Sequence, residues 1–394
     1  MNDSVSNSAC PEKRLLVLCA RTRTTPAIAE EIRRILETEP DWDYLLSEAA
    51  ENSITPLLDL QLRAVAQNAV PAAPREKLTA ACRANTVRNL FLAGELTKVL
   101  GMLRSQGIEA ISYKGPVLAS QVYGDVTRRE FEDLDIVVRQ RDMPQAHQAM
   151  LELGYHLKFD WILSANAVAS LVPGEYNYRD EQRRVMVELH TEITLRHFPA
   201  VPDLEELLRA SVPVMVGGCE VRTFSVEDGL PILCIHGSKD FWERLSWIAD
   251  ISELLEAYPA LDWSAVLRRA ESLKAERMLN VGLALANGLL GTPLPEEISS
   301  QVKADRVAET LADEVEQRLL SRELPPLDAT GRFHFRRRML AGAMAGWRYA
   351  MRLAVVPAEE DWMMMRLPRP LAPLYLALRP LRLLRKYGWI GRRA

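Results

Sequence analysis

The chain of 394 residues is long enough for two or three domains, or for one domain with large additions. Hydrophobic residues make up 48% and charged residues 26%, a balance that is typical of a globular protein and excludes global disorder. The formal net charge of −4 conceals an asymmetry, because residues 331–394 hold thirteen arginines and one lysine against three acids. That balance of +11 leaves −15 on the first 330 residues.

The cysteines and the apolar runs indicate in which cellular compartment the protein is expected. The five cysteines form no C-x-x-C pair, which argues against a disulfide framework and against a structural zinc site. Residues 15–20 form an apolar run that is too short for a secretory signal, and no segment approaches the roughly eighteen apolar residues of a membrane span. We therefore expect a cytoplasmic protein.

Residues 1–105 are expected to form an N-terminal helical region. Apolar residues recur at spacings of three and four within residues 27–37, 41–67 and 75–107. Pro71 and Pro74 are expected to separate the last two helices.

Residues 106–225 alternate between short apolar strands and helices. Gly217 and Gly218 predict a hairpin over residues 212–225, and the charged "DEQRR" predicts an antiparallel strand pair. Strands are expected at residues 108–115, 133–139, 155–159, 175–180 and 183–193, with helices at 116–124 and 142–154. This pattern predicts a small α+β core with a mixed sheet.

The helical period returns after this core. Residues 226–330 are expected to form a helical domain whose first long segment is interrupted at Gly237 or Ser238. The expected fold class is therefore α+β, with the core held between N-terminal and C-terminal helical layers and followed by the basic segment of residues 331–394.

Two carboxylates open the strand in "FEDLDIVV". Asp133 and Asp135 are two residues apart, so their side chains share one face of a strand while Leu134 and Ile136 face the other way. Two like charges at that distance repel unless a cation lies between them, and Mg²⁺ prefers such oxygen ligands together with substrate phosphates. A solvated turn is the alternative. Because of the repulsion, Asp135→Asn is expected to leave the melting temperature of the metal-free protein equal or higher.

A third acid is offered by "VMVELHTEI". Glu188 and His190 share a face of the expected strand, and a glutamate within this apolar run requires a partner or a metal ion. The alternatives are a salt bridge from Glu188 to Arg183 or Arg184, and a satisfied core imidazole for His190.

Candidate anion-binding residues precede the carboxylates. In "SYKGP", Lys114 ends a strand and Gly115 forms the turn into a helix, whose N-terminal amides would face an anion. Arg129 is a second candidate for phosphate contact, with a solvated loop arginine as the alternative.

These motifs, in the order "YKG", "YGD", "RREFEDLDIVV", "LELGY" and "VMVELH", resemble the bacterial uncharacterised nucleotidyltransferase family of the DNA-polymerase-β-like superfamily. The later "IHGSKDFWERLSWIAD" resembles the helical part of the same family. The resemblance implies that Asp133 and Asp135 bind Mg²⁺, with Mn²⁺ as an alternative, and the nucleotide phosphates. It implies that Glu188 is the third acid, either as a base or as a shared metal ligand.

The resemblance also bears on the glycine turn and on residues of the helical part. The turn is Gly115–Pro116 where the superfamily has two small residues, so one amide donor is lost. His236 and Lys239 are expected to reach the site from the helical layer as accessory residues. For Asp250, a helix cap and a contact to an arginine of the core are both open.

The basic segment allows three readings: docking on the acidic body of the protein itself, RNA contact, or contact with an anionic membrane surface. Self-docking is expected, with the residues after about 385 left mobile.

The function predicted from sequence is a Mg²⁺-dependent transfer of an NMP group from an NTP to a hydroxyl of a small molecule, protein or RNA end. The alternatives are a catalytically degenerate member that binds a nucleotide or a partner, and a scaffold peripheral to the inner face of the membrane.

Overall fold

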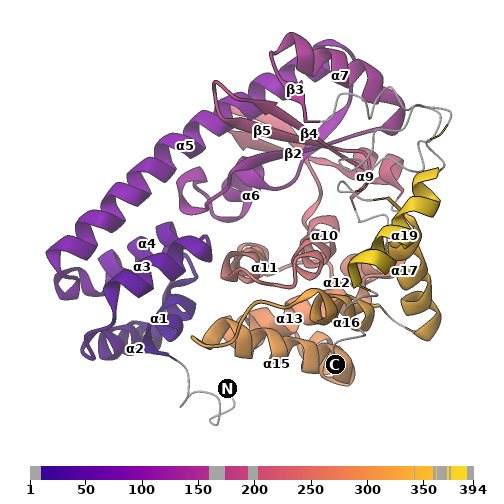
Figure 1. Ribbon diagram of the computed structural model, residues 1–394. Coiled ribbons are helices and arrows are strands. Elements are labelled where there is room, and N and C mark those ends of the chain that lie inside the picture. Colours follow the sequence, from indigo (N-terminus) through magenta and orange to yellow (C-terminus); the bar gives the residue numbers. More distant parts are fainter. Residues whose placement is uncertain are drawn as a thin grey trace.

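The computed structural model describes residues 10–158, 174–193, 203–340, 342–357, 361, 371 and 374–387. Within them a five-stranded sheet lies among helices that precede and follow it in the chain (Figure 1). This confirms the expected α+β class. No helix in the described ranges is long and apolar enough to cross a membrane. The expected mobility of the last residues concerns positions that are largely outside the described part of the chain.

The N-terminal region is helical, as predicted. Its helices are α1 (Pro11–Cys19), α2 (Pro26–Leu36), α3 (Trp42–Glu51), α4 (Thr55–Ala66) and α5 (Ala72–Ser105). The single helix expected at residues 41–67 is in fact two, because Ser53 has a φ of 54° and turns the chain between α3 and α4. Figure 1 shows the 34-residue α5 running from these helices to the sheet, so it connects the two parts of the molecule.

The sheet has the strand order β1-β2-β5-β4-β3. Its strands are β1 (Ala110–Ser112), β2 (Asp133–Val138), β3 (His156–Leu157), β4 (Glu175–Asp180) and β5 (Val185–His190). Strands β2 and β5 are parallel and the other pairs are antiparallel, which confirms the predicted mixed sheet and the predicted β4–β5 pair. The hairpin around Gly217 and Gly218 is also observed, as β6 (Val212–Val216) and β7 (Cys219–Thr223).

The two faces of the sheet differ in chemistry. Leu134 and Ile136 of β2 are fully buried in a cluster with apolar residues of α5 and α7 (Met143–Glu152), so these helices cover one face. The opposite face carries Asp135, Glu188 and other polar side chains and lies toward α10 (Val226–Lys239), as the contact between Lys239 and Glu175 shows. Alternation along the strands therefore gives an apolar face and a functional face.

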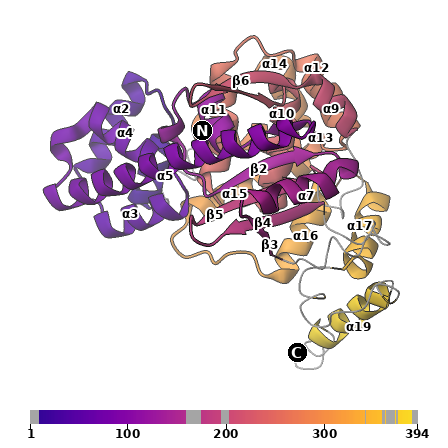
Figure 2. The same ribbon diagram turned by 90° about the horizontal axis from the view of Figure 1, so that it is seen from above.

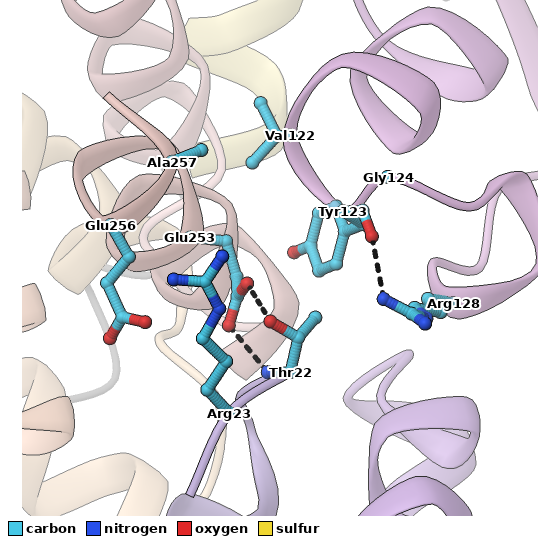
Figure 3. A pocket seen from close by; sticks show the side chains of 9 residues that line it. All are labelled: Thr22, Arg23, Val122, Tyr123, Gly124, Arg128, Glu253, Glu256 and Ala257. Atoms are coloured by element: carbon cyan, nitrogen blue, oxygen red, sulfur yellow. Dashed lines mark hydrogen bonds between the residues drawn. The ribbon is translucent and has the colours of Figure 1, made fainter. Parts of the chain in front are cut away.

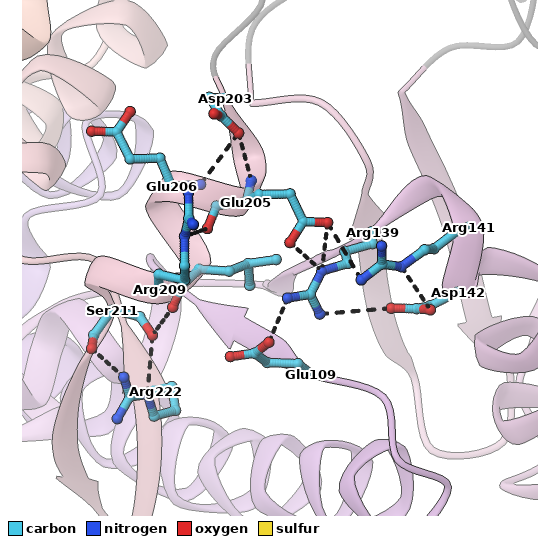
Figure 4. Close-up of polar contacts among 11 residues, drawn as sticks. Glu109, Arg139, Arg141, Asp142, Asp203, Glu205, Glu206, Arg209, Ser211 and Arg222 are labelled. Atoms are coloured by element: carbon cyan, nitrogen blue, oxygen red, sulfur yellow. Dashed lines mark hydrogen bonds and ion pairs between the residues drawn. The ribbon is translucent and has the colours of Figure 1, made fainter.

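Two further helices connect at the edges of the sheet. Helix α6 (Gly115–Val122) follows β1, and α9 (Leu204–Ala210) precedes β6. In Figure 4, Arg139 at the end of β2 bonds both carboxylate oxygens of Glu205 at 2.9 Å and Glu109 at 2.6 Å. The network orients α9, although partly exposed ion pairs of this kind contribute little each to stability.

The second helical layer begins with α10 and α11 (Leu245–Ala257). The chain turns at Phe241 and Trp242, both with positive φ, and not at Gly237 or Ser238 as the sequence predicted. Gly237 is needed for packing, because a Cβ there would lie 2.5 Å from the ring of Trp242. The layer continues with α12 (Trp263–Ser272), α13 (Glu276–Leu290), α14 (Glu296–Ala304) and α15 (Arg306–Leu320).

The basic C-terminal segment contributes α16 (Ala329–Met339), α17 (Ala343–Val355) and α19 (Tyr375–Tyr387). Phe335 of α16 is buried against Phe241, and Arg336 donates to the carbonyl of Lys239, so α16 packs on the helical layer. Helices α17 and α19 lie beside each other at the periphery of the molecule (Figure 2).

Candidate active site

The parallel pairing of β2 and β5 brings the predicted acids together. Asp135 lies opposite Glu188 in the register, and His190 is two residues further along β5 on the same face. Donor atoms of Asp135, Glu188 and His190 all lie within 4.8 Å of one another. The sequence predicted a metal site of Asp133, Asp135 and Glu188; the ligand atoms found this close together are those of Asp135, Glu188 and His190, and Asp133 as a metal ligand stays a prediction. Asp133 is at the strand's start, opposite Met186.

Asp135 is the most buried carboxylate of the site, with 1% of its surface exposed. Its Oδ1 contacts Lys114 Nζ at 2.7 Å and His190 Nε2 at 3.0 Å. Its Oδ2 is buried, and within the described part of the chain it has no hydrogen-bond partner. An unpaired carboxylate oxygen is costly to bury, so this atom is the strongest local indication of a cation site.

The cations around Asp135 set its charge. Burial alone would raise the pKa of Asp135, but Lys114 and His190 hold it well below its usual range. Burial would lower the pKa of His190, but its bonds to Asp135 and Glu188 raise that pKa to about 9. Without a bound metal ion, these pKa shifts favour an ionised Asp135 beside a protonated imidazole and an ammonium group.

The pKa of Asp133 is shifted in the opposite direction to that of Asp135. Burial and the neighbouring charge of Asp135 raise the pKa of Asp133 to about 6. The like-charge repulsion inferred from the sequence therefore falls on Asp133, while Asp135 is stabilised by two cations. The expectation that Asp135→Asn would leave stability equal or higher is replaced by the opposite one, because that change leaves Lys114 buried beside a neutral group.

Lys114 and Gly115 lie where the sequence placed them, at the turn from β1 into α6. Gly115 has a φ of +52°, and a Cβ there would lie 3.2 Å from the carbonyl oxygen of Asp133. Only glycine meets both conditions without strain. The turn thus brings the N-terminus of α6 directly against the start of β2.

Arg129 has a partner that the sequence did not assign to it. Its Nε and Nη2 donate to Asp250 of α11 at 2.8 and 2.9 Å, and Tyr123 donates to the same carboxylate at 2.7 Å. Of the two roles that were open for Asp250, the structure shows the contact to a core arginine. Arg129 as a phosphate ligand stays a prediction, and its observed contacts give it a role in positioning the loop that leads to Asp133.

Helix α10 supplies His236 and Lys239, both predicted as accessory residues. Lys239 Nζ lies 3.6 Å from Glu175 of β4, and Glu175 is opposite His190 in the register. Burial, and then the charge of Lys114, lower the pKa of His236 well below its usual range. His236 is therefore neutral in a site where His190 is charged.

Sequence reasoning missed two residues of this face. Burial would raise the pKa of Glu175, but the charges of Lys239 and then His190 lower it below its usual value. The ring of Tyr113 lies 6.0 Å from that of His190 and 5.2 Å from Lys114 Nζ. Alternation in "EYNYRD" indicates that Glu175 and Asn177 share a face, but no signal in the sequence gives the pairing register.

A separate cavity of about 210 Å³ is lined in part by Tyr123, the residue that donates to Asp250 (Figure 3). Tyr123 and Arg128 line it from one side, and Thr22 and Glu253 from another. Glu253 accepts from the backbone N–H and the hydroxyl of Thr22, both at 2.6 Å, so each of its carboxylate oxygens already has a hydrogen-bond donor. None of the predicted catalytic residues lines this cavity.

Comparison with known proteins gave three results. The family described as "Uncharacterised nucleotidyltransferase" matches residues 38–291. No curated protein matches the chain. Among solved structures, the antibiotic-resistance factor ANT(2'')-Ia is similar at 14% sequence identity and a TM-score of 0.33, over 46% of this chain and 90% of that one.

Proposed function

The chain belongs to the uncharacterised nucleotidyltransferase family, and from this premise we propose that it transfers an NMP group from an NTP to a hydroxyl acceptor with the aid of a divalent cation. The observation that supports this most is the buried, unpartnered Oδ2 of Asp135 beside Glu188. Asp135 lies on β2 beside Lys114 at the N-terminus of α6, and an ionised carboxylate there is suited to a cation that also binds phosphate oxygens.

The residues present fit such a cation. Asp135 and Glu188 offer the oxygen ligands that Mg²⁺ and Mn²⁺ prefer, and Asp133 is available at the start of the same strand. A neutral His190 would add an imidazole ligand that suits Mn²⁺ better than Mg²⁺; a protonated His190 would orient Asp135 by hydrogen bonding. When bound, the cation neutralises charge on the phosphates during transfer.

In the proposed reaction the acceptor oxygen attacks the α-phosphorus of the NTP, and the bond to the bridging oxygen of the β-phosphate breaks, so pyrophosphate leaves. A carboxylate oxygen of Glu188 takes the proton of the acceptor hydroxyl, or holds the cation together with Asp135. Lys114 and the amides at the N-terminus of α6 contact phosphate oxygens, with Lys114 exchanging part of its contact with Asp135. Lys239 and His236 border the site from α10.

The test is incubation of the protein with α-labelled NTPs, Mg²⁺ or Mn²⁺ and a cell extract, followed by a search for the labelled molecule. The proposal predicts label from the α position and none from the γ position. Asp135→Asn should remove the labelling, whereas Glu205→Gln, a carboxylate change in the network of Figure 4, should leave it unchanged. Labelling only from γ-labelled NTP would identify phosphoryl transfer instead.

A second candidate is a nucleotide-binding protein without turnover. The observation that favours it is the contact between Lys114 and Asp135, in which an ammonium group already supplies this carboxylate with a positive charge. Nucleotide binding that is unaffected by chelation of divalent cations, with no labelled product, would support this candidate and contradict the first.

A further inference from the structure

The C-terminal helices α17 and α19 carry an unusual surface. Large apolar side chains of both helices are exposed, and we call these residues the C-terminal apolar face: Met344, Trp347, Met351, Leu374, Leu381 and Leu384. Trp347 is 62% exposed and Leu384 is 67% exposed. Exposed apolar side chains that recur along neighbouring helices mark an interaction site more often than isolated exposed leucines do.

The exposed residues follow the helical period. Met344, Trp347 and Met351 are three and four residues apart on α17. Leu374 directly precedes α19, and Leu381 and Leu384 follow it by about two and about three helical turns. The three residues of α17 form one apolar stripe, and Leu381 and Leu384 form another on α19, as on an amphipathic helix at an interface; Leu376 is exposed on a different side of α19.

Other faces of the two helices hold them in place. Tyr349 of α17 is buried and stacks on Phe333 of α16, with ring centroids 6.1 Å apart. Tyr375 of α19 is buried in the hydrophobic cluster that includes the sheet residues. Arg379 donates to Asp361 at 2.7 Å and to the carbonyl of Leu353 at 2.8 Å. The exposed stripes are thus not needed to attach α17 and α19 to the protein.

The positive charge of the C-terminal segment favours an anionic partner. Arg348 and Arg385 are exposed on the same two helices, and residues 331–394 carry a balance of +11. Of the three acids in that segment, Asp361 is 5% exposed and paired with Arg379. Tryptophan, methionine and leucine combined with arginine form the composition of helices that lie in the headgroup region of an anionic bilayer.

We infer that the C-terminal apolar face binds the surface of an anionic lipid membrane. Lipid satisfies both components, because acyl chains receive the apolar side chains and anionic headgroups receive the arginines. RNA would pair with the arginines but would leave the leucines in water, since its backbone offers no apolar surface. A second copy of the chain that paired through the same face would bring two strongly basic segments together. This inference is independent of the proposed chemistry.

The experiment is sedimentation of the full chain with vesicles of phosphatidylcholine alone or mixed with phosphatidylglycerol. The test variant is Leu381→Glu with Leu384→Glu. The matched control is Val87→Glu with Leu90→Glu on α5, which adds the same two charges at sites that are 65% and 57% exposed. Melting temperatures of both variants are measured, and Trp347→Ala supplies a second variant without added charge.

The expected result is binding to phosphatidylglycerol vesicles that weakens in high salt, with little binding to phosphatidylcholine alone. The α19 variant should bind at least about tenfold more weakly, since two leucine side chains no longer enter the lipid. The α5 control should bind as the unmodified protein does. Equal binding of all variants, or no binding to either vesicle, would overturn the inference. A change of oligomeric state or a loss of RNA binding in the α19 variant, with vesicle binding unaltered, would assign the face to that partner instead.

Discussion

Two buried carboxylates of this protein, Asp135 and Asp250, face cations in different ways. Asp250 accepts from Arg129 and Tyr123, so that both of its oxygens are bonded. Asp135 has two cationic partners, Lys114 and His190, but both contact the same oxygen and leave Oδ2 without a partner in the described structure. The two side chains are 1% and 2% exposed, so burial does not distinguish them.

We propose that this difference separates a structural carboxylate, Asp250, from a ligand-binding one, Asp135. A buried ion pair whose hydrogen bonds are all made holds two elements together, and here Asp250 joins α11 to the loop before β2. Asn89 of α5 and Thr55 of α4 bind the same loop, at the carbonyl of Arg129 and the carboxylate of Glu130. In the proposed function the unused oxygen of Asp135 accepts a ligand instead, and Asp135 lies on β2, the strand that follows this fixed loop.

The largest effect is expected for Asp135→Asn. If the cation supplies several kcal/mol of transition-state stabilisation, nucleotidyl transfer should fall by roughly a thousandfold or more. The melting temperature of the metal-free variant should also fall, because Lys114 and His190 lose their anionic partner. Steady-state kinetics and thermal unfolding check both results. Near-normal transfer would show that the unpartnered oxygen has no role in catalysis.

Asp250→Asn should mainly lower stability. Removing the charge leaves Arg129 buried without an anion, at a cost of about 3–5 kcal/mol in the free energy of unfolding. Denaturant unfolding of the purified variant gives that value. The comparison fails if this variant is as stable as the original and loses transfer to the same extent as Asp135→Asn.

Lys114→Ala should act on the nucleotide. Loss of a charge-assisted contact of about 1.5–3 kcal/mol would raise the KM for NTP by roughly tenfold or more, with a smaller change in kcat. Kinetics at saturating and limiting NTP distinguish the two constants. An unchanged KM would restrict Lys114 to its contact with Asp135.

The smallest effect is expected for Tyr123→Phe, which removes one of the bonds to Asp250. Arg129 still occupies both carboxylate oxygens, so the free energy of unfolding should fall by only about 1 kcal/mol. Arg128 also donates to the carbonyl of Tyr123, which holds the backbone in place. A loss as large as that of Asp250→Asn would mean that the hydroxyl, and not the guanidinium, is the main partner.

The sequence predicted those features that depend on local period. Alternation paired Asp133 with Asp135 on one face of β2 and Glu188 with His190 on one face of β5, and a resemblance to a known family suggested roles for the three acids. The partner of Arg129 is 121 residues away on another helix, and nothing local connects the two positions. The contact of Lys114 with Asp135, and the inclusion of His190 in the metal-capable group, depend on the strand register and the turn at Gly115. These are set by the tertiary structure and not by local period.

Two glycines show the same limit of prediction from local sequence. Gly237 predicts a helix break by its propensity, yet it lies within α10 because the ring of Trp242 needs the space. Gly115, by contrast, lies at the predicted turn with the positive φ that favours glycine. Propensity alone does not separate these two uses of glycine.

The most direct test of the central claim is a titration of the purified protein with Mn²⁺, followed by electron paramagnetic resonance of the free ion. The account predicts a binding site that is weakened in Asp135→Asn and in Glu188→Gln and retained in Glu205→Gln. Since the readout is ion binding, it does not depend on knowing the acceptor. Equal Mn²⁺ affinity in the original protein, Asp135→Asn and Glu188→Gln would contradict the assignment of the cation to this pair of strands.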